Sequence, residues 1–83
     1  MALMNKARKL LNEAFPPPAK VSLQYDKGII GRVTSARFRG LDFIDRQNLI
    51  WEALDKRLTA DDRKRVVIIL ALTPEEEQAH LAS

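Results

Sequence analysis

The longest uninterrupted run of apolar residues, Val66–Leu72, sets the first limit on the fold of this chain. Seven residues are too few to cross a membrane, because a spanning helix needs about 20. The run is rich in β-branched side chains, and it is apolar at both odd and even positions, so both faces of a strand formed from it favour burial. We therefore expect Val66–Leu72 to be an interior strand of a sheet with helices around it.

The composition is typical of one globular domain, which we expect to cover residues 1–83. Hydrophobic residues make up 46% of the chain and charged residues 30%, close to the average for soluble domains. The absence of cysteine excludes a disulfide framework, a thiol nucleophile and a thiolate metal site within this sequence. Residues 1–9 carry charge with no apolar stretch behind them, unlike a secretory signal, so we expect a cytoplasmic protein.

The net charge of +3 is spread unevenly along the chain. Residues 1–41 hold eight Lys and Arg against two acids, a net charge of +6, whereas residues 42–83 hold six against nine, a net charge of −3. A basic half of this size allows weak attraction to nucleic acid or to an acidic partner. It is equally consistent with a surface that only keeps the protein in solution.

The first half of the chain predicts a helix and a hairpin. Apolar residues at spacings of three and four indicate a helix over residues 3–14, which Pro16–Pro18 ends because prolines donate no backbone hydrogen bond. Alternation of apolar and polar residues predicts strands over residues 21–26 and 29–36. The turn Asp26–Gly28 between them is short, so the two strands are expected to be antiparallel.

A longer helix is expected from the N-cap Asp42 to about Leu58, with Asp45 favouring its first turn. The apolar stripe of this helix is predicted to face the core. It comprises Phe43, Ile44, Leu49, Ile50, Ala53, Leu54 and Leu58. Trp51, on the same helix, is interpreted as a core residue, with an exposed anchor for a partner as the alternative.

Two further helix starts complete the fold. Thr59 with Asp62 is typical of a cap that opens a short helix. Thr73–Glu76 combines a threonine cap, a proline at the first helical position and a glutamate at the third. We therefore predict an α+β fold of element order α-β-β-α-α-β-α, in which helices cover one face of a three-stranded mixed sheet.

Few residues are candidates for chemistry. Gly28 and Gly31 match the GxxG spacing of a nucleic-acid clamp, but their place at the start of a strand favours a hairpin turn. His80 has no second ligand or nucleophile near it in the sequence, and Ser83 is at the terminus, so neither is expected to be catalytic. The acidic clusters lie at helix starts, where capping explains them.

One dense basic cluster is the candidate contact for nucleic-acid phosphates. It consists of Arg63, Lys64 and Arg65, with Lys56 and Arg57 just before them. The cluster has no aromatic residues interleaved for base stacking, and two neighbouring aspartates dilute its charge. A solvated surface is therefore the alternative interpretation.

A longer pattern resembles the BolA-like family. In that family a strand ends in Ser-x-x-Phe-x-Gly, as in Ser35, Phe38 and Gly40, and the following helix carries an apolar residue, any residue and arginine, as in Ile44 to Arg46. A final apolar strand then precedes Thr-Pro-Glu-Glu, which matches Thr73–Glu76. The resemblance covers about residues 20–78, and its element order agrees with the one predicted above.

The resemblance implies a small KH-like α/β fold without catalytic activity. Members of the family pair with monothiol glutaredoxins and share an iron–sulfur cluster, or act as DNA-binding regulators. The cluster role uses a histidine just before the last strand and a histidine or cysteine in the hairpin loop. This sequence has Asp61–Arg65 and Asp26–Gly28 at those places, and Gln47 where the family usually has histidine. Because arginine and lysine stay protonated at neutral pH, we expect no cluster ligation.

Taken together, these features predict a non-enzymatic BolA-like module that acts as a protein-binding adaptor or regulator. A monothiol glutaredoxin is the partner that the resemblance implies, and weak nucleic-acid binding through the basic cluster is the alternative. No catalytic residue, cofactor or metal is expected. Structural roles are predicted for the residues of the resembling pattern, namely Phe38, Gly40, Arg46, Thr73 and Pro74.

Overall fold

The computed structural model describes the backbone of residues 2–82 and the side chains of residues 2–79. The elements in chain order are α1 (Ala2–Ala14), β1 (Lys20–Tyr25), β2 (Ile29–Thr34), the 3-10 turn η1 (Ala36–Phe38), α2 (Phe43–Leu54), α3 (Ala60–Arg63), β3 (Val66–Leu72) and α4 (Pro74–Ala82). This order confirms the prediction. The interpretation of the His80 and Ser83 side chains lies outside the described residues. No helix in residues 2–82 is both long and apolar enough to span a membrane.

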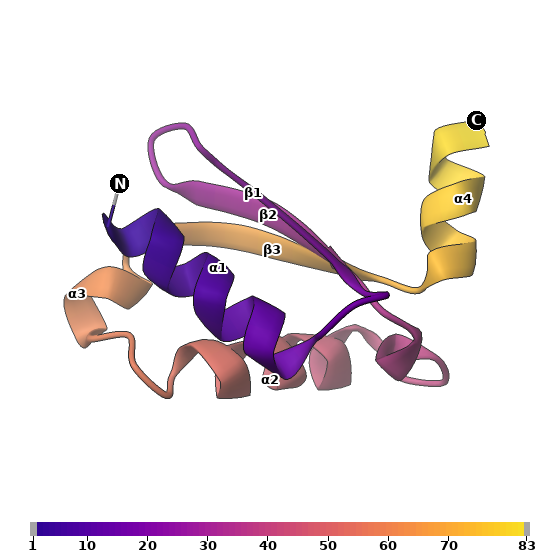
Figure 1. Ribbon diagram of the computed structural model, residues 1–83, viewed down its shortest axis with the longest axis horizontal. Helices are drawn as coiled ribbons and strands as arrows, with labels where there is room; N and C mark the ends of the chain where they lie inside the picture. The colour runs from indigo at the N-terminus through magenta and orange to yellow at the C-terminus, as the bar shows by residue number, and fades with distance from the viewer. Residues whose placement is uncertain (1, 83) are drawn as a thin grey trace.

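The sheet is mixed, as predicted, and its strands lie in the order β1-β2-β3. β1 and β2 are antiparallel, whereas β2 and β3 are parallel, with Ile30 opposite Ile68 and Arg32 opposite Leu70. α1 and α2 lie on one side of the sheet, and α4 stands at the end where β3 finishes, pointing away from α2 (Figure 1). The second strand is shorter than expected, because Ser35 caps η1 by accepting a hydrogen bond from the Arg37 amide.

The position of β3 contradicts the prediction of an interior strand. Among the described residues β2 pairs with both other strands, so it is central, and β3 lies at an edge. Ile69 is 2% exposed and belongs to the core. Ile68 and Leu70 alternate with it and are 42% and 46% exposed, so they point to the opposite face. The run is therefore apolar on both faces although Ile68 and Leu70, on the face opposite Ile69, are exposed.

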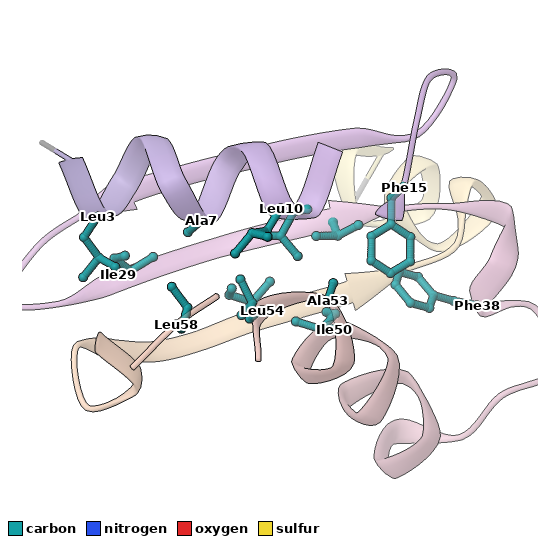
Figure 2. Packing of buried hydrophobic residues seen from close by; sticks show 13 residues of the cluster. Leu3, Ala7, Leu10, Phe15, Ile29, Phe38, Ile50, Ala53, Leu54 and Leu58 are labelled. Atoms are coloured by element: carbon teal, nitrogen blue, oxygen red, sulfur yellow. The ribbon is translucent and has the colours of Figure 1, made fainter. Parts of the chain in front are cut away.

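The core fills the space between the sheet and the two helices α1 and α2. Figure 2 shows Leu3, Ala7 and Leu10 of α1 directed toward the side chains of α2 and the sheet. At one end the rings of Phe15 and Phe38 lie with their centroids 5.2 Å apart. The core comprises Leu3, Ala7, Leu10, Leu11, Phe15, Ile29, Val33, Phe38, Ile50, Ala53, Leu54, Leu58 and Ile69.

The first turn of α2 departs from the predicted apolar stripe. Phe43 and Ile44 are 65% and 67% exposed, whereas Ile50 and Leu54 are fully buried. The N-terminal turn extends past the core, and the side chains of α2 that pack in the core begin at Leu49 and Ile50. The helix also ends at Leu54 instead of continuing to Leu58, although Leu58 is buried in the segment that follows.

Candidate functional site

Arg46 joins three parts of the chain at the end of the sheet. Its Nε donates to the Leu41 carbonyl at 2.9 Å, and its Nη1 donates to the Ala71 carbonyl at 3.2 Å and to Glu76 Oε1 at 2.6 Å. The side chain is only 15% exposed. Because the acceptors belong to the loop before α2, to β3 and to α4, Arg46 holds these three segments together.

Gln47, the residue that replaces the histidine usual in the family pattern, contacts the same strand. Its Nε2 donates to the Ile69 carbonyl at 2.9 Å. The Leu72 carbonyl accepts from Ser35 on the β2 side, and carbonyls alternate in direction along a strand. The Ile69 and Ala71 carbonyls therefore face the free edge of β3, where side chains of α2 supply their hydrogen-bond donors.

The Phe-x-Gly part of the family pattern has a structural role at both residues. Phe38 is fully buried against Phe15. Gly40 has a φ of 78°, a conformation that side chains with a Cβ rarely adopt. Apart from Gly40 and its two chain neighbours, no described residue has an atom within 4 Å of the place where a Cβ would stand, so the backbone conformation alone favours glycine.

The start of α4 is capped as predicted from Thr73–Glu76. The Glu76 amide donates to Thr73 Oγ1 at 3.1 Å, and the Thr73 amide donates to Glu76 Oε1 at 2.8 Å. Pro74 is the first helical residue, where its missing N–H leaves no hydrogen bond unmade. The hydrogen bonds from Arg46 and then from the Thr73 amide lower the pKa of Glu76 from 4.5 to about 2.

Glu77 brings a carboxylate to the end of the sheet, where it is 9% exposed. Thr34 Oγ1 donates to Glu77 Oε2 at 2.6 Å, Arg32 Nε lies 3.7 Å from the same oxygen, and Lys20 Nζ lies 3.5 Å from Oε1. The Thr34 hydrogen bond, followed by the charge of Lys20, lowers the pKa of Glu77 despite its desolvation. A carboxylate on α4 is thus held by one hydroxyl and two cations of the sheet.

The three consecutive glutamates of α4 are attached to different elements. Glu75 accepts a two-pronged hydrogen bond from Arg39, with Nε at 2.8 Å from Oε1, and this bond lowers the pKa of Glu75. Glu76 contacts α2, and Glu77 contacts β1 and β2. No side chain of residues 74–79 belongs to the hydrophobic core, so the contacts described for α4 are mainly polar.

Two of the three cations in the basic run Arg63–Arg65 lie beside carboxylates. Arg63 Nε lies 3.3 Å from Asp55 Oδ1, and its guanidinium carbon lies 5.1 Å from the centre of the Trp51 ring. Trp51 is half-buried at the margin of the core. Lys64 Nζ lies 3.9 Å from Asp61 on the same turn, and Arg65 is exposed.

The cations before the run line different hollows of the surface. Lys56 lies beside a hollow that also contains Arg37, whereas Arg57 lines one of about 310 Å³ with Lys6 and Lys9 of α1. Lys56 therefore lines a different hollow from Arg57, and Arg57 lies with Lys6 and Lys9, two lysines that were not among the predicted residues. In the sequence, Lys6 and Lys9 are indicated as basic surface residues only by the net charge of +6 in residues 1–41.

Lys6 connects this basic hollow to the next one. It also lines a hollow of about 330 Å³ that contains Asp62 and Arg65, and its Nζ lies 3.1 Å from Asp62 Oδ2. The Thr59 amide, followed by Lys6, lowers the pKa of Asp62. The two neighbouring hollows form what we call the α1 groove, with Lys6, Lys9, Arg57 and Arg65 as its cations and Glu13 and Asp62 as its acids.

The fold brings together the two places where the family pattern has cluster ligands. The Ile29 amide donates to the Arg65 carbonyl at 2.6 Å, and a Cβ on Gly28 would lie 3.0 Å from the same oxygen. The hairpin turn and the segment before β3 are therefore adjacent. Residues 26–28 and 61–65 contain no imidazole or thiol, so their side chains do not fit an iron–sulfur cluster.

Among the side chains of residues 2–79, large exposed apolar ones occur in α2, in β3 and at the end of β1. In α2 they are Phe43 and Ile44, and in β3 they are Val67, Ile68 and Leu70. Tyr25, at the end of β1, is about half exposed. Single apolar residues on a surface are common, but adjacent ones mark candidate contacts with other macromolecules.

The comparisons with known proteins agree with this architecture. No family model and no curated protein sequence matches the chain. Among solved structures, the crystal structure of a Bol-like protein from Babesia bovis superimposes with a TM-score of 0.58 and 23% sequence identity, covering 93% of this chain and 91% of that one. The α+β architecture is therefore a BolA-like fold, as the resemblance implied.

Proposed function

We propose that this chain is a BolA-like macromolecular-interaction module, and specifically a non-enzymatic protein-binding adaptor or regulator of the cytoplasm. The fold similarity supports the class. The single observation that carries the binding role is the exposure of large apolar side chains on a domain of only 83 residues. Burying them in a complex is favourable, at about 25 cal/mol for each Å² removed from water.

A capture experiment tests this proposal with a matched surface variant. The parent chain and a variant with Phe43, Ile44, Ile68 and Leu70 changed to serine are immobilised at equal density, after circular dichroism has shown that both are folded. We expect the parent to retain specific proteins from extracts of its native cells and the variant to lose them. Retention of the same set by both chains, or of none by the parent, contradicts the role of these side chains.

The partner that the family resemblance suggests is a monothiol glutaredoxin. On this proposal the chain docks to it but supplies no ligand to an iron–sulfur cluster, because the residues at the ligand positions are unsuitable. The test is reconstitution of the cluster with the purified glutaredoxin, with and without the chain. A new cluster absorption band that needs the chain and disappears in His80→Ala would refute the proposal.

Nucleic-acid binding is the second candidate, and the α1 groove is the observation that favours it. Lys6, Lys9 and Arg57 line one hollow, whereas Arg63 of the predicted run is already paired with Asp55 and stacked on Trp51. Converging cations bind phosphates without reading sequence. Such binding is expected to be weak and non-specific.

Two triple variants distinguish the groove from the run. Binding of a fluorescent 20-base-pair duplex is measured over a range of salt concentrations. Three phosphate contacts give a log–log salt slope of about −2.7, since each contact contributes about −0.9. We expect serine at Lys6, Lys9 and Arg57 to remove this slope, and serine at Arg63, Lys64 and Arg65 to change it less. The reverse order would assign the contact to the run, and no binding by the parent at low salt would exclude this second candidate.

A further inference from the structure

The face of the sheet opposite α1 and α2, called the open face below, carries three rows of side chains. Ile29 and Val33 point into the core, so the residues that alternate with them point to the open face. The strand register then places one residue of each strand in every row. In the order β1, β2 and β3, the first row consists of Gln24, Ile30 and Ile68, the second of Ser22, Arg32 and Leu70, and the third of Lys20, Thr34 and Leu72.

The open face is amphipathic from one edge to the other. Its β3 side carries Ile68, Leu70 and Leu72, whereas its β1 side carries only polar or basic residues. Arg32 lies in the middle, with 36% of its side chain exposed. A hollow of about 230 Å³ over β1 and β2 is lined by Ile30 and Arg32 among others. The face thus combines an apolar strip, cations beside it and a shallow hollow over β1 and β2.

The end of the open face, at the third row and Arg32, already binds an acidic helix of the chain itself. α4 places Glu77 against Thr34, Lys20 and Arg32. The strand residues of the open face include two cations and no acid. Glu77 balances one of these two charges, so a further carboxylate complements the positive charge that is left. The second row contains Arg32 beside Leu70, and α4 leaves both Ile68 and Leu70 exposed.

Two other occupants fit this surface less well. An added β-strand would need the free edge of β3, but Arg46 and Gln47 already donate to its Ala71 and Ile69 carbonyls. A second copy packed face to face around a two-fold axis through the central strand would bring the two Arg32 side chains close to each other. The strand residues of the second open face would supply no acid to pair with them.

We infer that the open face binds an amphipathic helix of another protein, with an apolar stripe on Ile68 and Leu70 and acidic residues beside Arg32. This inference rests on the proposed adaptor role and names the kind of segment the partner supplies. The helix lies alongside α4 and repeats the contact that Glu77 makes. Its apolar residues cover the part of the sheet that α4 does not reach.

Synthetic helical peptides provide the probe. One 16-residue peptide carries leucines at spacings of three and four with glutamates on both flanks, and a matched peptide replaces every glutamate by lysine. Binding is measured by anisotropy of a dye on the peptide, and the site is mapped from amide chemical shifts. We expect the glutamate peptide to bind at least tenfold more tightly and to shift the amides of Ile30, Arg32, Ile68 and Leu70.

Surface variants of the full chain then test the apolar contact and the charge contact separately. Leu70→Ser removes apolar contact and Arg32→Gln removes the charge, and each is expected to weaken binding of the glutamate peptide at least fivefold. Arg8→Gln is the matched control for the charge, because it removes a guanidinium from α1 on the opposite side of the sheet, and it should leave the affinity unchanged. Circular dichroism confirms that each variant is folded.

Several outcomes would overturn the inference. They are equal binding of the two peptides, no binding by the glutamate peptide, shifts centred on Phe43 and Ile44, and self-association of the chain that Leu70→Ser abolishes. The adaptor proposal fails differently. If the capture experiment retains proteins from the extract and Leu70→Ser with Arg32→Gln does not release them, the adaptor role stands and the open-face assignment is wrong.

Discussion

The two faces of the sheet are held to their helices by different kinds of interaction. α1 and α2 pack on one face through a continuous apolar core. α4 is attached at the end of the other face through Glu75, Glu76 and Glu77, each paired with a different element. Apolar burial has no preferred direction and scales with area, whereas hydrogen bonds and ion pairs depend on geometry, pH and salt.

This difference indicates which parts of the molecule are expected to lose structure together when a residue is changed. A change in the core weakens contacts among α1, α2 and the whole sheet, so it lowers the stability of the entire domain. A change at α4 affects a helix whose described contacts are few and polar, so it is expected to act locally. Variants in the core and at α4 test that division.

Phe38→Ala should have the largest effect. Removing a fully buried aromatic ring from the core costs about 3–5 kcal/mol, a large share of the stability of a domain this small. Urea denaturation measures the loss. Phe43→Ala is the matched control, since its ring is 65% exposed and its removal should change stability by no more than about 0.5 kcal/mol. Equal stability of the Phe38 variant and the parent would contradict the core assignment.

Gly40→Ala should have a smaller effect that is still global. The φ of 78° at Gly40 is unfavourable for a residue with a Cβ by about 1–2 kcal/mol, and the absence of neighbouring atoms means that no clash is added. The same denaturation experiment measures it. Gly40→Asn should lose less, because asparagine tolerates this conformation better. A loss as large as that of Phe38→Ala would show that the space around Gly40 is filled.

Acid should release α4 before it unfolds the core. The pKa of Glu76 is lowered to about 2, so its contribution to stability is fully present above its ordinary pKa of 4.5 and is lost as the pH falls toward 2. The lowered pKa values of Glu75 and Glu77 act in the same direction. NMR shifts of residues 74–79 are therefore expected to change between pH 4.5 and 2 while the signals of Leu54 persist. Simultaneous loss of both sets would contradict the division.

Arg39→Gln should have the smallest effect. Its ion pair with Glu75 is exposed on both sides, and such pairs contribute little to global stability. We expect an unchanged thermal midpoint, together with faster backbone motion in the first turn of α4 measured by NMR relaxation. The control is Arg8→Gln, whose only described side-chain contact is to the neighbouring Asn5. A lower midpoint for Arg39→Gln alone would show that α4 supports the whole fold.

The local features of the fold could be predicted because they depend on neighbouring residues. The caps Thr59 with Asp62 and Thr73 with Glu76 form the predicted reciprocal hydrogen bonds. The hairpin follows from alternation around a short turn, and Lys27 and Gly28 have the positive φ values that such turns require. The element order and the fold class follow from these local signals.

The remaining features depend on contacts between distant segments. An apolar run such as Val66–Leu72 has the same pattern in a central strand and in an edge strand with an apolar outer face, so strand order cannot be derived from it. The exposure of Phe43 depends on where the core ends. Lys9 and Arg57 are almost fifty residues apart in sequence, and only the packing of α1 beside the segment after α2 brings them into one hollow.

The pairing of β2 with β3 also constrains the order of folding. β1 and β2 are joined by a short turn, whereas Ile30 must find Ile68 across a segment that contains α2 and α3. Closing such a loop costs more entropy than forming a hairpin, and non-local pairing slows folding. The hairpin and the helices are therefore expected to form before β3 docks. Stopped-flow kinetics of Ile69→Val should then show faster unfolding and an almost unchanged folding rate, and a slower folding rate would place β3 in the folding nucleus.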